Sequence, residues 1–481
     1  MEPSLQKRTS KSLFWVAIDV FGQQLMQFGI GIFLARLLMP EEFGIIGLIA
    51  VFLAFSRVFV DSGLSFALLR KKEVQLVEYT TVFWFNLGMS TFFYLLLFLA
   101  AGKIAAFYNL PELNNIVKVL AILLIINAFG SVQEIKLKKA LKFKTLTIIG
   151  FISKLVAGVT AIIMALKGFG VWSLVAQQFL IRTLRVLLLY VFNWFWPKLE
   201  FSVLHFRELF AVGSKLLYGS IVNAIVHNIY PVLIAKVFTV SDVGFFNRAR
   251  GYQELPVLFI TGIVQQVSLP TFALIQDEED RFLSSYRRAI VATLFLVLLP
   301  LAILVVNAFP LIEFLITDKW LPAAPMLQIL AIAGVFYPVS ALNVNIIGIK
   351  GRTDLVMITQ FLKDGLTILG IVVGIFFGIF GLLWAIAFTS TISFYINIHY
   401  TAKVINYPVK KQLVDLFPVV LLGLSSAGLG FLLSNFIHLS NLPYIIVQTL
   451  IISSFYLGVS YLLKVPELEL AYSMLKNMIK K

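Results

Sequence analysis

Long apolar runs separated by short polar breaks make up most of this chain. A helix that crosses a bilayer needs about 20 predominantly apolar residues, and fourteen runs reach that length. They cover 12–38, 44–69, 79–102, 113–132, 145–166, 170–193, 207–238, 245–270, 288–309, 322–347, 354–377, 380–402, 413–433 and 442–463. The pattern predicts an all-α integral membrane protein of about 14 transmembrane helices. The first run lacks a small-residue cleavage site, so we expect a retained helix and not a removed signal peptide.

Composition supports this class and leaves no room for a separate soluble domain. Hydrophobic residues make up 60% of the chain and charged residues only 13%, whereas soluble proteins carry about 25% charge. The chain has no cysteine, which excludes disulfides, thiolate metal sites and cysteine nucleophiles. A net charge of +15 would suggest a nucleic-acid partner in a soluble protein. In a membrane protein the position of the charge matters more, and we expect no nucleic acid.

The loop charges predict the orientation of the chain. Loops on the cytoplasmic side of a membrane carry an excess of Lys and Arg. With the N-terminus inside, most basic loop residues alternate onto the cytoplasmic side. The opposite side holds only Arg36, Lys103, Lys167, Lys236 and Lys319. The bias predicts that the N- and C-termini are both cytoplasmic.

A weak internal repeat divides the predicted helices. Matching positions 200 or 211 residues apart are Ala35 with Ala235, Arg36 with Lys236, Glu42 with Asp242, Gly44 with Gly244, Gly170 with Gly381 and Ala176 with Ala387. Six spans separate the matches, which predicts two six-helix parallel repeats related by an axis along the membrane normal. We expect an N-lobe at 1–193, a cytoplasmic connector at 194–206 and a C-lobe at 207–402. Two further helices and a cytoplasmic tail fill 403–481.

Charged residues inside the predicted spans are the main functional candidates. A charge facing lipid at mid-bilayer costs about 2.5–3.5 kcal/mol, so we expect most of them to face protein or a water-filled cavity. On the first helix, Asp19, Gln23 and Gln27 recur every four residues and form one polar stripe. On the seventh helix, Asn223 and His227 occupy the matching face 200 residues later. Together these stripes predict a hydrated cavity between the two bundles.

The charges of this predicted cavity are more basic than acidic. The basic candidates are Arg57, Lys154, Lys215, Arg248, Arg250 and Lys363, and the acidic ones are Asp19, Asp61, Glu254 and Asp364. Arg and Lys pair with phosphate or carboxylate groups. A basic cavity therefore favours an anionic cargo.

Two pairs of opposite charges on predicted helices each allow two interpretations. Arg57 and Asp61, and likewise Arg250 and Glu254, stand four residues apart. Each pair is compatible with a cavity role or with an intrahelical ion pair that only neutralises its own charges.

Other intramembrane cations also admit a second interpretation. Lys154 and Lys363 lie at matching depths and either line the cavity or extend to the cytoplasmic interface. Arg182 and Arg185 lie near a predicted cytoplasmic helix end, so we expect them to contact lipid headgroups. His227 has no second histidine nearby, and we expect it to form a hydrogen bond and not to bind a metal.

Several short motifs resemble those of the polysaccharide flippases. They are the segment from Ala35 to Gly44, Asp61-Ser62-Gly63-Leu64 at the end of the second helix, and Ser268-Leu269-Pro270 before an acidic loop. With the arrangement of six, six and two spans, the chain resembles the Wzx-type exporters of the multidrug/oligosaccharidyl-lipid/polysaccharide superfamily. The resemblance implies that it flips undecaprenyl-pyrophosphate-linked oligosaccharide, as an O-antigen, capsule or exopolysaccharide unit, across the bacterial inner membrane by alternating access.

The resemblance also implies roles for the candidate residues. The pyrophosphate would lie against some of Arg57, Lys154, Arg248, Arg250 and Lys363, and the glycan along Gln23, Gln27, Asn223 and His227. Asp19, Asp61, Glu254 and Asp364 would be candidates for coupling to an ion gradient. Besides the substrate and membrane lipid, the implied partners are a polysaccharide polymerase and a chain-length regulator.

Competing functions differ in features that the sequence carries. A cation-coupled antiporter for drugs or other small molecules, from the same superfamily, would be expected to have a mainly acidic cavity. A polymerase or lipid-linked ligase usually needs a large extracytoplasmic loop, and the longest predicted one surrounds Trp320. No nucleotide-binding loop, metal-ligand spacing or nucleophile–base pair is present in the sequence. We therefore expect a transporter without catalytic residues, metal or cofactor.

Overall fold

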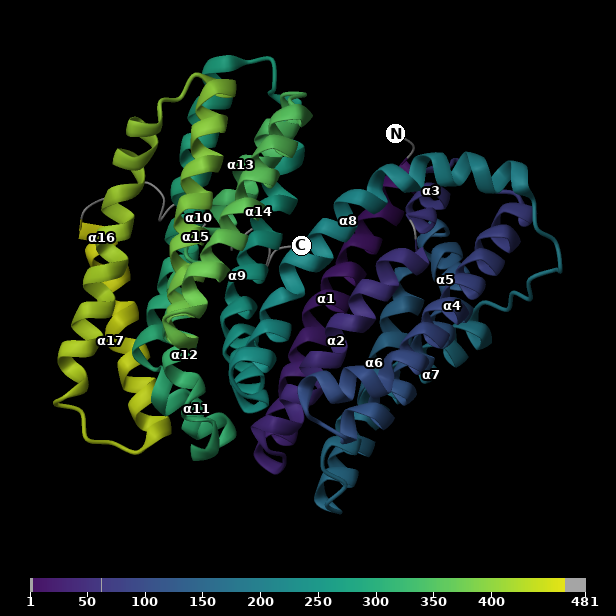
Figure 1. Ribbon diagram of the computed structural model, residues 1–481. Helices are drawn as coiled ribbons and strands as arrows, with labels where there is room; N and C mark the ends of the chain where they lie inside the picture. The colour runs from purple at the N-terminus through teal and green to yellow at the C-terminus, as the bar shows by residue number, and fades with distance from the viewer. Residues whose placement is uncertain (1–2, 62, 463–481) are drawn as a thin grey trace. The chain divides into compact units, whose positions relative to one another are not determined.

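The computed structural model describes residues 3–61 and 63–462, apart from the side chains at 3–14, 16–18, 20, 21, 215, 216, 218, 219, 222, 223, 225 and 227. Every regular element in these ranges is helical (Figure 1). The elements are α1 (Pro3–Leu37), α2 (Pro40–Asp61), α3 (Leu64–Arg70), α4 (Leu76–Tyr108), α5 (Glu112–Lys139), α6 (Phe143–Leu166), α7 (Val171–Phe192), α8 (Val203–Val237), α9 (Val240–Leu274), α10 (Glu279–Val306), α11 (Ala308–Ile316), the 3₁₀ turn η1 (Asp318–Trp320), α12 (Ala323–Gly334), α13 (Tyr337–Ile349), α14 (Thr353–Ile375), α15 (Gly378–Ile405), α16 (Val409–Ser434) and α17 (Asn441–Leu462). The all-α prediction is confirmed.

The described residues contain 12 helical segments long and apolar enough to cross a membrane. Each coincides with a predicted run, and α12 and α13 together form one of them. The two other predicted runs, 12–38 and 207–238, fall on α1 and α8, whose side chains are described only in part. The chain is a multi-pass membrane protein, and the total of fourteen spans stays a prediction.

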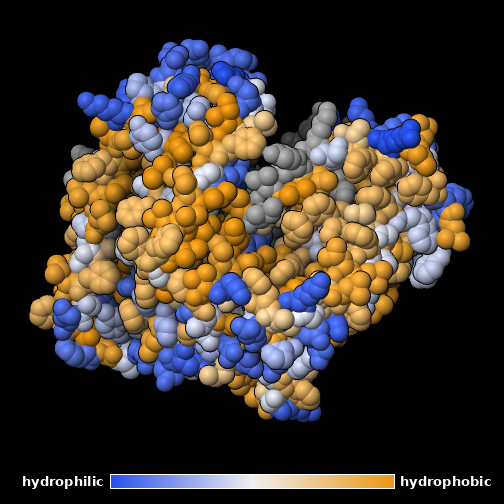
Figure 2. Space-filling model, viewed as in Figure 1, coloured by the Kyte–Doolittle hydropathy of each residue, from blue (hydrophilic) through white to orange (hydrophobic). Residues whose placement is uncertain are grey.

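The outer surface agrees with this assignment. Figure 2 shows a broad hydrophobic surface on each part of the chain, with hydrophilic residues gathered toward the edges of that surface. Long apolar side chains such as Leu99 on α4 and Leu155 on α6 are 78% and 55% exposed. Exposure on this scale fits a protein whose surrounding medium is lipid and not water.

By its internal contacts the chain divides into unit 1, Met1–Gly244, and unit 2, Phe245–Lys481. In unit 1 the hairpins α4–α5 and α6–α7 pack on each other, α1 packs on α6, and α8 packs on α2, α3 and α4. In unit 2 the hairpin α14–α15 contacts α12 and α13, and the terminal helices α16 and α17 pack on α10. The predicted lobe boundary at the connector stays a prediction.

A buried polar network attaches α16 to the rest of unit 2. The fully buried Tyr286 of α10 donates its hydroxyl to Asn343 of α13 and to Gln412 of α16, the latter at 3.3 Å. Tyr407, between α15 and α16, donates to Asp415, which also accepts from Arg287 at 2.5 Å. Burial, followed by the neighbouring carboxylate, raises the pKa of Tyr407. The phenol therefore stays a hydrogen-bond donor at neutral pH.

Glycines allow close packing where α2, α3 and α8 meet. Gly63 separates α2 from α3 with φ of 70°, a left-handed conformation that glycine adopts without steric cost. A Cβ at Gly63 would lie 2.5 Å from the carbonyl oxygen of Gly213 on α8. The predicted run 44–69 was therefore wrong as a single helix, because the chain turns at this glycine to pack against α8.

The beginnings of α2 and α9 form reciprocal contacts 200 residues apart in the sequence. A Cβ at Gly44 would overlap the carbonyl oxygen of Val240, and a Cβ at Gly244 would overlap that of Pro40. The two acidic residues that match in the sequence, Glu42 and Asp242, also form equivalent hydrogen bonds to the backbone three residues earlier. Glu42 accepts from the backbone N–H of Met39 at 2.6 Å and Asp242 from that of Thr239 at 3.1 Å. This equivalence supports the predicted repeat.

Candidate functional site

Four basic side chains of unit 1 gather between α2, α6 and α7. Lys154 of α6 interacts electrostatically with Arg182 and Arg185 of α7, and Arg57 of α2 interacts with Arg182. All four side chains are half-buried. Their helices are candidate membrane spans, so the charges lie among apolar segments. We refer to Arg57, Lys154, Arg182 and Arg185 as the basic cluster.

Two members of the basic cluster have carboxylate partners. Arg185 donates to Glu134 of α5 from two nitrogens, at 3.1 and 3.3 Å. Glu134 is shared with Lys138, whose ammonium lies 2.9 Å away. Lys154 interacts with Asp19 of α1. Arg185 thus pairs with the carboxylate on α5, and the expectation that it contacts lipid headgroups stays a prediction.

The polar stripe of α1 contacts the basic cluster at one end. Gln23 is buried and donates its amide to Asp19. Lys154 lies 3.5 Å from the backbone oxygen of Gln23. A Cβ at Gly150, one turn before Lys154, would overlap the amide of Gln23, so the glycine lets α1 and α6 approach. Gln27 is exposed.

Arg57 differs from the rest of the basic cluster. Its Nε is buried and has no hydrogen-bond partner among the described atoms. Asp61, one turn later on α2, instead accepts a hydrogen bond from Ser65. Arg57 and Arg182 are thus interacting cations in a cluster whose carboxylate partners are Asp19 and Glu134. In a medium of low dielectric this arrangement favours a bound anion, because like charges repel strongly there.

The unit 2 candidates are more nearly neutralised. Arg250 and Glu254 form an intrahelical ion pair at 2.7 Å on α9, which is the second of the two alternatives considered above. Arg248 lies over the ring of Trp320, 5.8 Å from its centroid, and interacts with Tyr252. This cation–π contact is a favourable position for a guanidinium away from water.

Lys363 and Asp364 form the remaining pair, on α14. Lys363 is half-buried and interacts with Asp364. Asp364 is buried and accepts from the Gln360 amide at 2.8 Å through one oxygen. Its other oxygen has no hydrogen-bond partner among the described atoms. The side chains of Lys215, Asn223 and His227 lie outside the described part of the chain, and their roles stay predictions.

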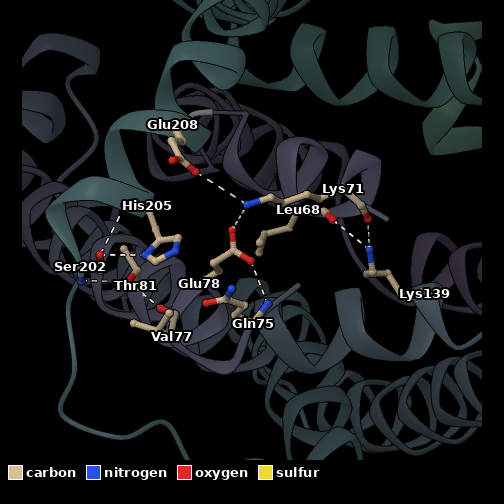
Figure 3. A network of polar contacts seen from close by, with 10 residues as sticks. All are labelled: Leu68, Lys71, Gln75, Val77, Glu78, Thr81, Lys139, Ser202, His205 and Glu208. Carbon is tan, nitrogen blue, oxygen red and sulfur yellow. Dashed lines mark hydrogen bonds and ion pairs between the residues drawn. The ribbon is translucent and has the colours of Figure 1, made fainter. Parts of the chain in front are cut away.

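A second polar network lies within unit 1, beside the connector that precedes α8 (Figure 3). The buried carboxylate of Glu78 on α4 accepts from Lys71 and from the backbone N–H of Gln75, the latter at 2.8 Å. Lys71 also lies 3.7 Å from Glu208 on α8. At the N-terminus of α8, the backbone N–H of Ser202 donates to Thr81 at 3.1 Å. This network fixes the start of α8 to α4.

No group of three or more His, Asp, Glu or Cys side chains suited to a metal ion occurs among the residues that the structure describes. Sequence reasoning missed Arg182 as a neighbour of Arg57 because they lie on helices far apart in the chain. The signal available was their shared type, arginine inside an apolar segment.

The family of the chain follows from comparison with known proteins. Residues 33–325 match the family of polysaccharide biosynthesis proteins. The chain belongs to this family. It is 26% identical to the succinoglycan biosynthesis transport protein ExoT of Rhizobium meliloti, over 71% of this chain and 69% of that protein. It is also 26% identical to the lipopolysaccharide biosynthesis protein WzxC of Escherichia coli, over 77% of this chain and 76% of that protein.

Solved structures show a fold like this one. The lipid II flippase MurJ in an inward closed conformation aligns with a TM-score of 0.75, at 15% identity, over 94% of this chain and 98% of that one. An inward-facing multidrug transporter of the MATE family aligns with a TM-score of 0.62, also at 15% identity, over 82% of this chain and 98% of that one. The all-α, two-lobed membrane fold class predicted from the sequence is confirmed.

Proposed function

We propose that this protein is a flippase that moves a lipid-linked oligosaccharide with a phosphate-bearing headgroup across the bacterial inner membrane by alternating access. The family and the printed names of the transport proteins ExoT and WzxC support a role in polysaccharide export. MurJ, whose fold the chain shares, is named a lipid II flippase. In this proposal the termini are cytoplasmic and no bond is broken during transport.

The observation that carries the proposal is the pair of Arg57 and Arg182. Arg57 has a buried Nε without a hydrogen-bond partner among the described atoms and interacts electrostatically with the guanidinium of Arg182. Guanidinium groups bind phosphate through paired N–H donors. A pyrophosphate placed against these two side chains would supply the missing negative charge. Lys154 would contribute from α6, and the amides of Gln23 and Gln27 would meet the glycan.

The other residues of the predicted site have supporting roles in the proposal. Arg248 and Lys363 supply positive charge in unit 2, where Glu254 neutralises Arg250. Lys215, Asn223 and His227 extend the polar surface from α8. Asp364 has a buried oxygen without a hydrogen-bond partner among the described atoms, and we assign it to ion coupling ahead of Asp19, Asp61 and Glu254. Replacement by Asn should make transport insensitive to the ion gradient. Unchanged gradient dependence in Asp364→Asn would remove this assignment.

A deletion and complementation experiment tests the flippase proposal. Cells lacking the gene should accumulate lipid-linked oligosaccharide on the cytoplasmic leaflet, measured by its inaccessibility to an added glycan-binding lectin in spheroplasts. Arg57→Gln and Arg182→Gln should each lower transport about tenfold or more, because a charged hydrogen bond contributes roughly 1.5–3 kcal/mol. Arg281→Gln is the matched control, since Arg281 is exposed and pairs only locally with Glu278 at 3.1 Å.

Three outcomes are distinct. Accumulation in the deletion strain with full activity of both arginine variants would reject the basic cluster as the phosphate site but keep the flippase function. An absence of accumulation in the deletion strain would reject the function itself. Loss of activity in Arg281→Gln as well would show that the loss at Arg57 and Arg182 is not specific to the site.

A further inference from the structure

The connector between α7 and α8 carries an exposed apolar surface. Trp194 and Trp196 are 74% and 69% exposed, and Leu199 is 89% exposed. Single exposed apolar residues are common, but a contiguous group of this kind marks a surface that is covered by another medium or molecule. We call residues 194–204, which run from the connector into the first turn of α8, the strap.

The strap presents its two tryptophans on one side, because exposed and buried side chains alternate along 194–197. Side chains of an extended segment alternate between two faces. Phe195 and Pro197 are buried, while Trp194 and Trp196 point away from unit 1 with their rings stacked at 19°, 6.4 Å apart. The alternation therefore separates a face that packs on the protein from a face of indole rings.

Contacts with α4 and α5 hold the inner face in place. The indole nitrogen of Trp84 donates to the backbone oxygen of Lys198 at 2.8 Å, and the ammonium of Lys136 lies 4.2 Å from the Phe195 ring centroid. Ser202 is held by Thr81, as Figure 3 shows. The strap is thus an ordered part of unit 1, and its indole rings have a fixed direction.

The lipid-facing surface of α7 continues directly into the strap. Val191 and Phe192, the last residues of this candidate membrane span, are 75% and 51% exposed. Trp194 follows two residues later, at the level where a helix leaves the hydrocarbon. Tryptophan is enriched at this level because its ring is amphipathic, and the adjacent Lys198 carries a charge suited to phosphate.

We propose that the strap lies in the phospholipid headgroup layer, with Trp194, Trp196 and Leu199 inserted into the bilayer surface. The strap is then a membrane-surface anchor that fixes the start of α8 relative to the bilayer. This proposal concerns the lipid contact alone and does not depend on what the protein transports.

Spin labelling can measure the depth of the strap directly. The chain contains no cysteine, so a nitroxide can be placed at Leu199→Cys or Leu204→Cys in the full-length protein without other changes. In liposomes of phosphatidylethanolamine and phosphatidylglycerol, collision rates with oxygen and with a water-soluble nickel complex report immersion. Glu73→Cys, in the exposed α3–α4 loop, is the aqueous control. Leu155→Cys, at the middle of α6, is the hydrocarbon control.

The expected result is a depth between those two controls at both strap positions. Adding Trp194→Ser and Trp196→Ser to Leu199→Cys should shift the label toward the aqueous value. A label as accessible to nickel as Glu73→Cys would overturn the proposal. Protection from both oxygen and nickel would also overturn it, because a protein and not lipid would then cover the strap.

Discussion

Lys71 and Glu78 show how one buried carboxylate depends on a single cation. Glu78 is buried, and an unpaired buried charge is strongly destabilising. Lys71→Met should therefore lower the free energy of unfolding by about 2 kcal/mol. Lys72→Met, at the exposed neighbouring position, should change it by less than about 0.5 kcal/mol. Thermal unfolding of both variants in detergent makes the comparison, and equal melting temperatures would contradict it.

The same pair predicts a pH dependence. The hydrogen bond to Glu78 raises the pKa of Lys71. A raised lysine pKa stabilises the folded state below the unfolded value of about 10.4, and the effect is lost as pH rises through the folded value. The difference in melting temperature between wild type and Lys71→Met should therefore be constant from pH 6 to 9. A difference that disappears already at pH 8 would exclude this pairing.

At the level of elements, the glycine turn between α2 and α3 predicts that substitution of Gly63 lowers the stability of the protein. Gly63→Ala introduces a Cβ in a left-handed conformation, at about 1–2 kcal/mol, and places it 2.5 Å from the Gly213 oxygen. We expect a lower melting temperature and less protein in the membrane. Gly88→Ala is the matched control, because its Cβ would meet nothing within 4 Å on α4. It should be neutral or slightly stabilising.

Helix boundaries also show what the sequence could and could not predict. Apolar runs located the long helices well because hydrocarbon imposes both their length and their composition. Hydropathy did not show the break at Gly63, since Leu64 and its neighbours continue the apolar pattern. Only the motif Asp61-Ser62-Gly63-Leu64 indicated a helix end there. The neighbourhood of Arg57 and Arg182 was equally hidden, because hydropathy gives the depth of a residue but not which helices pack together. Arg250 with Glu254 needed only local spacing, and the pair is present.

For the whole molecule, the predicted orientation can be tested with the same cysteine-free background. Lys167→Cys, in the loop between α6 and α7, should react in intact cells with a thiol reagent that does not cross the inner membrane. Arg281→Cys, in the first turn of α10, should react only after the membrane is permeabilised. Both positions follow from the bias of basic residues toward the cytoplasm. The reverse labelling pattern would invert the predicted topology.

The reciprocal contact between the starts of α2 and α9 has an evolutionary consequence. Gly44 meets Val240 while Gly244 meets Pro40, so each member of the repeat offers the same patch to the other. Such an isologous contact is the hallmark of a two-fold homodimer. A half-length ancestor carrying one copy of this patch would already have been able to associate with itself. Gene duplication would then have joined two partners that fitted each other before they were linked.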